Sequence, residues 1–187
     1  MSNLFISIHN DDESLYGSYL IQRLKPLVVV VTDGQQHLEK FGVPIQQRRD
    51  ETIEAMKILE PAEVRFSGIP DTCFDKDVFI KALKDLNFTG GIVFAPATEG
   101  GNPHHDIISQ VAEECFGETS LVLYYGTYGP NRVTPIGELK ITGTEEEREK
   151  KHQSLQCYTS QLKINPRFFE ENDFGPEYIS FNRIQNA

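Results

Sequence analysis

The 187-residue sequence has few cysteines, no long apolar run and fewer basic than acidic residues. Its three cysteines, Cys73, Cys115 and Cys157, are widely spaced and form no CxxC pair. This pattern argues against a disulfide framework and against a cysteine metal knuckle. It is typical of a reducing compartment, so we expect a cytoplasmic protein.

No stretch approaches the roughly 18 consecutive apolar residues of a membrane-spanning helix, and the N-terminus shows no basic region of a secretory signal. The 18 basic residues are outnumbered by 28 acidic residues, which gives a formal net charge of −10. Such a chain is repelled by phosphate backbones, and no cluster of lysines or arginines offers a local exception. We therefore expect neither a membrane span nor a nucleic-acid partner.

Short apolar runs alternate with helical patterns along the chain. The patterns predict strands at 4–8, 27–31, 64–66, 91–95, 121–125, 138–142 and 178–181, and helices at 15–24, 47–59, 77–86, 106–116 and 145–162. This alternation indicates a mostly parallel sheet with helices on both faces. We expect an α/β protein, a Rossmann-like three-layer sandwich, with one domain over residues 1–187.

Two polar clusters follow predicted strands. "HNDDE" (9–13) comes directly after the strand at 4–8, and "ATEGGNPHHD" (97–106) follows the strand at 91–95. In open α/β sheets ligands bind beyond the carboxyl ends of the strands, where the topology switches. The two clusters are therefore expected to face each other at one end of the sheet, with the long loop at 126–137 as a rim.

The first cluster has the composition of a metal site. His9 and Asp12 are three residues apart where a strand turns into a helix, so both side chains can point at one position. The second cluster brings the pair His104 and His105. Two imidazoles and one carboxylate, with other positions open, describe a catalytic metal site that retains a water. A divalent cation would also offset the mutual repulsion of the three consecutive acids at 11–13.

Asp11 would lie beside such a metal without being needed as a ligand, and a carboxylate near metal-bound water is suited to act as a general base. Two other interpretations are open at this stage. The first cluster can be a polar loop with an N-capping aspartate, or the histidines and carboxylate can form the facial triad of an iron oxygenase. The parallel α/β order disfavours the oxygenase, because such sites are usually built on β-barrels.

The motifs resemble those of a known family. "IHNDDE" (8–13) resembles the HPDDE signature of the zinc-dependent N-deacetylases related to the GlcNAc-phosphatidylinositol deacetylase, the LmbE-like or PIG-L group. "EGGNPHHD" (99–106) is similar to the second metal motif of that family, commonly written HPDH. The stretches that resemble other family segments are "RRDETIEAMKIL" (48–59), "FSGIPD" (66–71), "SLQCYTSQ" (154–161) and "GPEYISF" (175–181). The resemblance spans nearly the whole chain in the order of the family.

This resemblance implies a single LmbE-like deacetylase domain over residues 1–187 that binds Zn²⁺. His9, Asp12 and His105 would be the zinc ligands, with His105 chosen because Pro103 then matches the proline of the motif. Asp11 would be the catalytic base that deprotonates the water. Glu13 would support the turn from outside the ligand set.

The substrate side of the site departs from the family pattern. Asn10 replaces the usual proline of the first motif, and Asn102 stands where many members have a histidine that helps to stabilise the oxyanion. Asparagine can donate a hydrogen bond to an oxyanion, but it neither carries charge nor shuttles a proton. The leaving amine would then be protonated by Asp11, or by His104 if that side chain swings inward. Arg48 and His104 are expected to contact the substrate.

The function that the resemblance implies is hydrolysis: removal of an N-acetyl group from an amino sugar or sugar conjugate. The alternative, favoured by Asn102, is a binding protein of the same fold that keeps the metal with weak or no turnover. The expected partner is a small N-acetylated sugar. The resemblance also implies a possible homo-oligomer, either a trimer or a hexamer.

Overall fold

The structure is a computed structural model that describes residues 2–35 and 39–184. The strands are Leu4–Ser7 (β1), Leu27–Thr32 (β2), Glu63–Ile69 (β3), Ile92–Pro96 (β4), Leu121–Tyr125 (β5), Leu139–Ile141 (β6) and Glu177–Ser180 (β7). The helices are Asp12–Tyr16 (α1), Ser18–Leu24 (α2), Ile45–Leu59 (α3), Lys76–Lys84 (α4), Pro103–Phe116 (α5), Glu145–Gln156 (α6), Thr159–Ile164 (α7) and Pro166–Asn172 (α8). None of these helices is long and apolar enough to cross a membrane.

The seven strands of the described residues form one sheet in the order β3-β2-β1-β4-β5-β7-β6. Strands β1 to β5 run parallel, while β7 is antiparallel to both β5 and β6. The predicted mostly parallel sheet is confirmed. From β1 the chain proceeds outward to β2 and β3, and then crosses to β4 on the other side of β1. This reversal is a topological switch point, so the loops after β1 and β4 emerge side by side.

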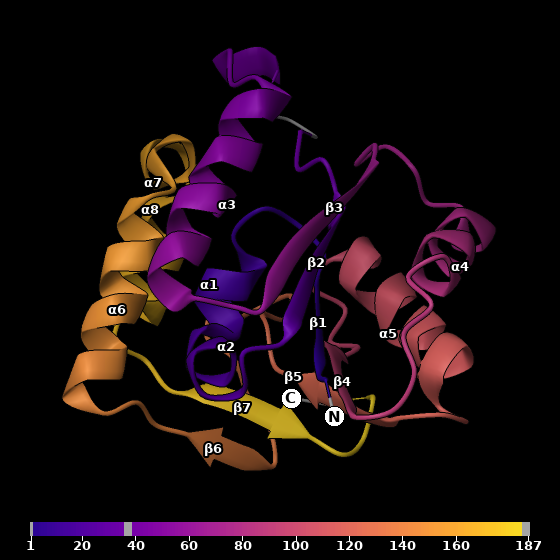
Figure 1. Ribbon diagram of the computed structural model, residues 1–187. Coiled ribbons are helices and arrows are strands. Elements are labelled where there is room, and N and C mark those ends of the chain that lie inside the picture. The colour runs from indigo at the N-terminus through magenta and orange to yellow at the C-terminus, as the bar shows by residue number, and fades with distance from the viewer. Residues whose placement is uncertain (1, 36–38, 185–187) are drawn as a thin grey trace.

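Helices cover both faces of the sheet (Figure 1). The face covered by α4 and α5 buries Leu4 and Ile6 of β1 and also Ile8, which lies just beyond the strand. The opposite face, covered by α1, α2, α3 and α6, buries Phe5. Side chains of a strand alternate between faces, and here both faces are buried, which explains why the central strands are continuous apolar runs.

Two predicted helices are interrupted in the structure. The helix expected at 15–24 is divided into α1 and α2 at Gly17, where an added Cβ would lie 2.2 Å from the Phe5 ring. The helix expected at 145–162 is divided into α6 and α7 by a turn at Cys157 and Tyr158. The prediction missed α8 altogether.

The helix predicted at 106–116 begins three residues earlier, at Pro103. The side-chain oxygen of Asn102 caps this helix by accepting the backbone N–H of His104 at 2.9 Å, and Pro103 takes the first helical position. Both residues are typical of a helix start. The pair His104 and His105 therefore lies on the rigid first turn of α5, with the central strand β1 nearby.

A buried ion pair joins the α6 layer to the antiparallel end of the sheet. The Lys151 ammonium lies 3.3 Å from the Glu177 carboxylate, and both side chains are at most 1% exposed. Glu177 also accepts the backbone N–H of Tyr19 at 3.0 Å, which links α2 to β7. Burial lowers the pKa of Lys151 and raises that of Glu177, while each partner opposes the shift of the other.

We expect Lys151→Met to lower the free energy of unfolding by about 3–5 kcal/mol near neutral pH, because the Glu177 charge is left buried without its partner. A carboxyl whose folded-state pKa is raised stabilises the protein in its protonated form, so the loss should shrink on acidification toward about pH 5. Urea unfolding at the two pH values measures both effects. The exposed Lys163→Met is the control, and equal losses in the two variants would contradict the expectation.

Candidate metal centre

The turn between β1 and α1 forms the floor of the site. The backbone N–H of His9 donates to the Asp12 Oδ2 at 3.0 Å, and the Asp11 N–H donates to the His9 carbonyl at 3.0 Å. These bonds bring the His9 Nδ1 within 3.3 Å of the Asp12 Oδ2. The two side chains that the sequence places three residues apart therefore meet at one point.

Glu13 holds this turn from beneath. Its fully buried carboxylate accepts hydrogen bonds from the Ser7 hydroxyl at 2.5 Å, from the Tyr158 hydroxyl at 2.5 Å and from the Asp11 N–H at 3.3 Å. Burial raises the pKa of Glu13, and the two hydroxyl donors oppose that shift. This position agrees with the expected role of Glu13 as a support outside the ligand set.

His105 completes the group from the first turn of α5. Its Nε2 lies 3.1 Å from the Asp12 Oδ2, and its Nδ1 lies 3.2 Å from the Thr127 Oγ1. The Thr127 hydroxyl donates its proton to the Glu99 carboxylate at 2.7 Å, so it accepts the Nδ1–H of His105. In this tautomer the lone pair of Nε2 faces the Asp12 carboxylate. Two electron-rich atoms at this distance are stabilised by a cation that both can bind.

The three side chains fit a zinc-like ion. His9, Asp12 and His105 each offer one ligand atom, and these atoms lie within 4.8 Å of one another. Two imidazole nitrogens and one carboxylate oxygen are the donor set of catalytic zinc sites, which leave a position for water or substrate.

The pKa values of the ligand group reflect its mutual contacts. Burial would raise the pKa of Asp12, but hydrogen bonds and positive charge from the two imidazoles in their protonated forms outweigh burial and hold it well below its usual range. A metal ion bound by the same nitrogens would take the place of those protons. Burial would lower the pKa of His9, but Asp12 and the neighbouring acids raise it to about 9. A proton on His9 therefore competes with a metal ion, and binding of the ion releases that proton.

Asp11 lies next to this group but is not part of it. Its Oδ2 accepts from the Arg48 Nη2 at 3.3 Å, and its side chain is 14% exposed. Burial raises the pKa of Asp11 to about 7, with Arg48 opposing the shift. A carboxyl that titrates near neutrality can both take and return a proton.

Arg48 and Asn10 tie the turn to α3. The buried Asn10 donates its side-chain N–H to the Thr52 hydroxyl at 3.1 Å, so the turn is anchored although the usual proline is missing. Arg48 is 2% exposed and donates to Asp11. Among the described residues, its Nε and Nη1 have no hydrogen-bond partner.

A cavity of about 510 Å³ opens above the ligand group. Its polar lining residues include His9, Asp11, Asp12, Lys40, Arg48, Asp71, Asn102, Tyr128, Gln161 and Asn165. Its apolar lining residues include Phe41, Ile164, Phe168 and Phe169. Tyr128 belongs to the loop at 126–137, which was expected to form the rim.

Asn102 and His104 differ in their relation to this cavity. Besides capping α5, Asn102 donates its Nδ2–H to the Tyr128 hydroxyl at 2.9 Å. Among the described residues, His104 is not one of those that line the cavity. Its Nε2 is 3.0 Å from the Cys73 carbonyl and its ring stacks on Phe74 at 4.4 Å, so an inward swing would break both contacts.

Sequence reasoning missed Thr127, Glu99 and Asp71 as members of the site. Asp71 carried a signal, because it follows β3 at the same edge of the sheet as His9 follows β1. Thr127 and Tyr128 follow β5 at that edge too. Glu99 belongs to the second polar cluster of the sequence, but its hydrogen bond to Thr127 forms only when the loops after β4 and β5 come together in the fold.

Comparison with protein families matches residues 4–116 to the family described as GlcNAc-PI de-N-acetylase, PIG-L. The matched region contains both predicted metal motifs. Comparison with curated proteins gives no match.

Several solved structures share the fold. A conserved protein from Thermus thermophilus is 18% identical, with a TM-score of 0.73 over 100% of this chain and 97% of the other. The zinc inhibited form of a teicoplanin deacetylase is 15% identical, with a TM-score of 0.70 over 95% and 96% of the two chains. The N,N'-diacetylchitobiose deacetylase from Pyrococcus horikoshii is 18% identical, with a TM-score of 0.65 over 91% and 76%.

We expect Thr127→Val to weaken zinc binding about 10–100-fold, because His105 loses the partner that fixes its tautomer. Competition with a chromogenic chelator measures the dissociation constant. The matched control is Thr119→Val, an exposed threonine beyond the far end of α5. Unchanged zinc affinity in the Thr127 variant would mean that the hydrogen bonds from His105 to Thr127 and from Thr127 to Glu99 do not support a metal ligand.

Proposed function

Because the chain belongs to the GlcNAc-PI de-N-acetylase family, as its motifs predict, we propose that it is a zinc-dependent hydrolase that removes an N-acetyl group from an amino sugar or sugar conjugate. The observation that carries this proposal is the group His9, Asp12 and His105 with Asp11 beside it, because His9, Asp11 and Asp12 all line one cavity. Structural neighbours named as deacetylases of teicoplanin and of N,N'-diacetylchitobiose support this substrate class.

His9, Asp12 and His105 would hold the zinc ion. When bound, zinc polarises the acyl carbonyl and lowers the pKa of a bound water. Asp11 is placed to accept the proton of the attacking water, because its carboxylate lines the cavity next to the ligand group. After taking this proton, the Asp11 carboxyl can return it to the leaving amine. Arg48, at 3.3 Å, holds the carboxylate in place between the two transfers.

The oxyanion of the tetrahedral intermediate needs a donor from the cavity wall. The Tyr128 hydroxyl accepts from Asn102, so its own proton is available for a ligand in the cavity. Burial raises the pKa of Tyr128, which keeps the hydroxyl protonated. Tyr128 therefore donates to the oxyanion, and Asn102 positions it while keeping a second Nδ2–H for the same oxyanion.

The cavity lining offers groups for both parts of a sugar conjugate. Asp71, Arg48 and Lys40 offer acceptors and donors for sugar hydroxyls. The aromatic side chains Phe41 and Phe168 offer apolar surface for a ring face or an aglycone.

We extend the proposal to the whole chain as one deacetylase domain over residues 1–187, located in the cytoplasm. A single sheet that takes strands from Leu4–Ser7 to Glu177–Ser180 supports one domain. Three free cysteines fit a reducing compartment. A trimer or a hexamer stays a prediction, and light scattering would test it.

The second candidate function is a binding protein that keeps the metal with weak or no turnover. It is favoured by Asn102, which stands where many family members have a histidine. Zinc bound by the purified protein, with no acetate released from a broad panel of N-acetyl sugars, would favour this candidate over the hydrolase.

We expect Asp11→Asn to lower kcat for acetate release about 10²–10⁴-fold while zinc content stays at the wild-type level, because a base is lost but no ligand. Acetate release from the N-acetyl sugar panel and metal analysis give the two readouts. Asp50→Asn, an exposed position on α3, is the matched control. Wild-type activity in the Asp11 variant would refute the base assignment.

We expect Tyr128→Phe to lower kcat about 10²-fold with a smaller change in KM, since the lost donor acts on the transition state. Tyr178→Phe, on β7 away from the cavity lining, controls for loss of a hydroxyl. A change confined to KM would assign Tyr128 to ground-state binding instead.

A further inference from the structure

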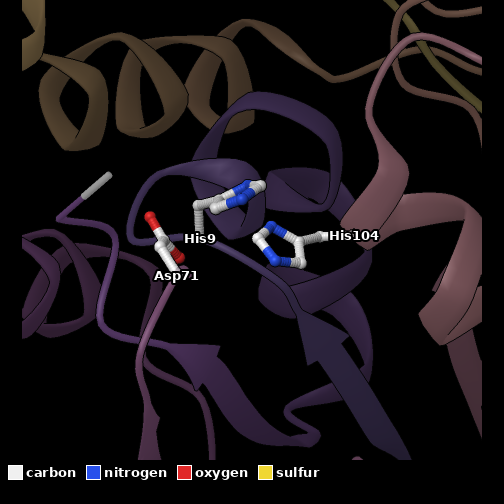
Figure 2. A group of neighbouring side chains, drawn as sticks. All are labelled: His9, Asp71 and His104. Carbon is white, nitrogen blue, oxygen red and sulfur yellow. The ribbon is translucent and has the colours of Figure 1, made fainter. Parts of the chain in front are cut away.

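A second group of ligand atoms adjoins the first. His9, Asp71 and His104 each offer one such atom, and these atoms lie within 4.8 Å of one another. Asp71 is 5% exposed and His104 is 2% exposed. Figure 2 shows the His9 and His104 rings next to each other with the Asp71 carboxylate beside them. The three residues come from separate parts of the chain: the turn after β1, the loop after β3 and the first turn of α5.

The tautomer of His104 follows from its neighbour. A carbonyl oxygen only accepts, so the contact of 3.0 Å between Nε2 and the Cys73 carbonyl means that Nε2 carries the proton. The lone pair is then on Nδ1, which is free to bind a cation. The ring is fixed by stacking on Phe74 at 4.4 Å and by an edge contact with Phe79 at 6.1 Å. His104 is therefore a preorganised imidazole ligand.

Asp71 is held in a comparable way. Its backbone N–H donates to the Asp33 carboxylate at 3.1 Å, which fixes the start of the loop after β3. The side chain belongs to the lining of the cavity, together with His9. An imidazole on a helix and a carboxylate on an anchored loop thus converge on His9.

From this convergence we propose that His9, Asp71 and His104 form a second binding position for a divalent transition metal ion, next to the Asp12–His105 position. Two imidazoles and one carboxylate favour zinc, copper, nickel or cobalt over magnesium or calcium. Alignment of Pro103 with the proline of HPDH puts His104 on the aspartate of that motif. The second position is thus a departure of this chain from the family pattern.

Because His9 is common to both groups, the two positions compete. A neutral imidazole has one lone pair, so His9 binds one cation at a time. An ion at the second position takes His9 away from Asp12 and His105. Excess metal is therefore expected to move His9 between the two groups. This inference rests on the proposed function only in treating His9, Asp12 and His105 as the tighter position, and its test measures bound metal.

The test removes the tighter position and asks whether zinc still binds. We expect His105→Ala to bind one zinc ion with reduced affinity, measured by chelator competition. Adding His104→Ala or Asp71→Asn to that variant should raise the dissociation constant at least about tenfold further, a lower bound because even partners outside the ligand set contribute that much. Adding His152→Ala, on α6, should leave it unchanged. Equal zinc affinity in His105→Ala and His105→Ala/His104→Ala would overturn the proposal.

A second measurement covers the case in which His105→Ala does not fold. The ring nitrogens of ¹⁵N-labelled wild-type protein are followed by NMR during a zinc titration. We expect the His104 Nδ1 resonance to shift only beyond the first equivalent of zinc, together with a second change at His9. If only His9 and His105 respond at every zinc concentration, the second position does not exist. Zinc binding of the expected pattern without acetate release would refute the proposed function and leave this inference standing.

Discussion

The site depends on one buried carboxylate. Asp12 Oδ2 accepts the His9 N–H at 3.0 Å, and it is 3.3 Å from the His9 ring and 3.1 Å from the His105 ring. These contacts join the turn after β1 to the first turn of α5, 93 residues later in the sequence. Without a positive charge, Asp11, Asp12 and Glu13 would repel one another in a place with little water. The hydroxyls around Glu13, the guanidinium beside Asp11 and the imidazoles beside Asp12 each offset part of that repulsion.

The sheet topology provides the edge on which these contacts form. Strand order reverses beside β1, so the loops after β1 and β4 are neighbours without any long insertion. The loop after β5 adds Thr127, and the loop after β3 adds Asp71. The proposed ligands and base therefore sit at or directly after the ends of rigid elements. Such placement gives more precise geometry than a site built on mobile loops.

Much of the fold and the centre of the site could be predicted from the sequence. The central strands are continuous apolar runs, as a parallel sheet covered on both faces requires. The pairing of His9 and Asp12 could be predicted because the two residues lie only three positions apart in the sequence. The roles of Thr127 and Glu99 could not be predicted, because they depend on contacts between distant parts of the chain that leave no local sequence pattern. The break at Gly17 depends on the Phe5 ring, and the start of α5 was misplaced although Asn102 and Pro103 marked it.

Asn102 has two simultaneous tasks. Its oxygen caps α5, and its amide nitrogen donates to the Tyr128 hydroxyl. Loss of a capping side chain alone costs about 1 kcal/mol, and here the helix start also carries both histidines. A histidine at this position would therefore alter the start of α5, the hydrogen bond to Tyr128 and the placement of His105 together. Substitutions at positions 102 and 128 are thus expected to occur together in related sequences, so that the residue type at one position predicts the residue type at the other.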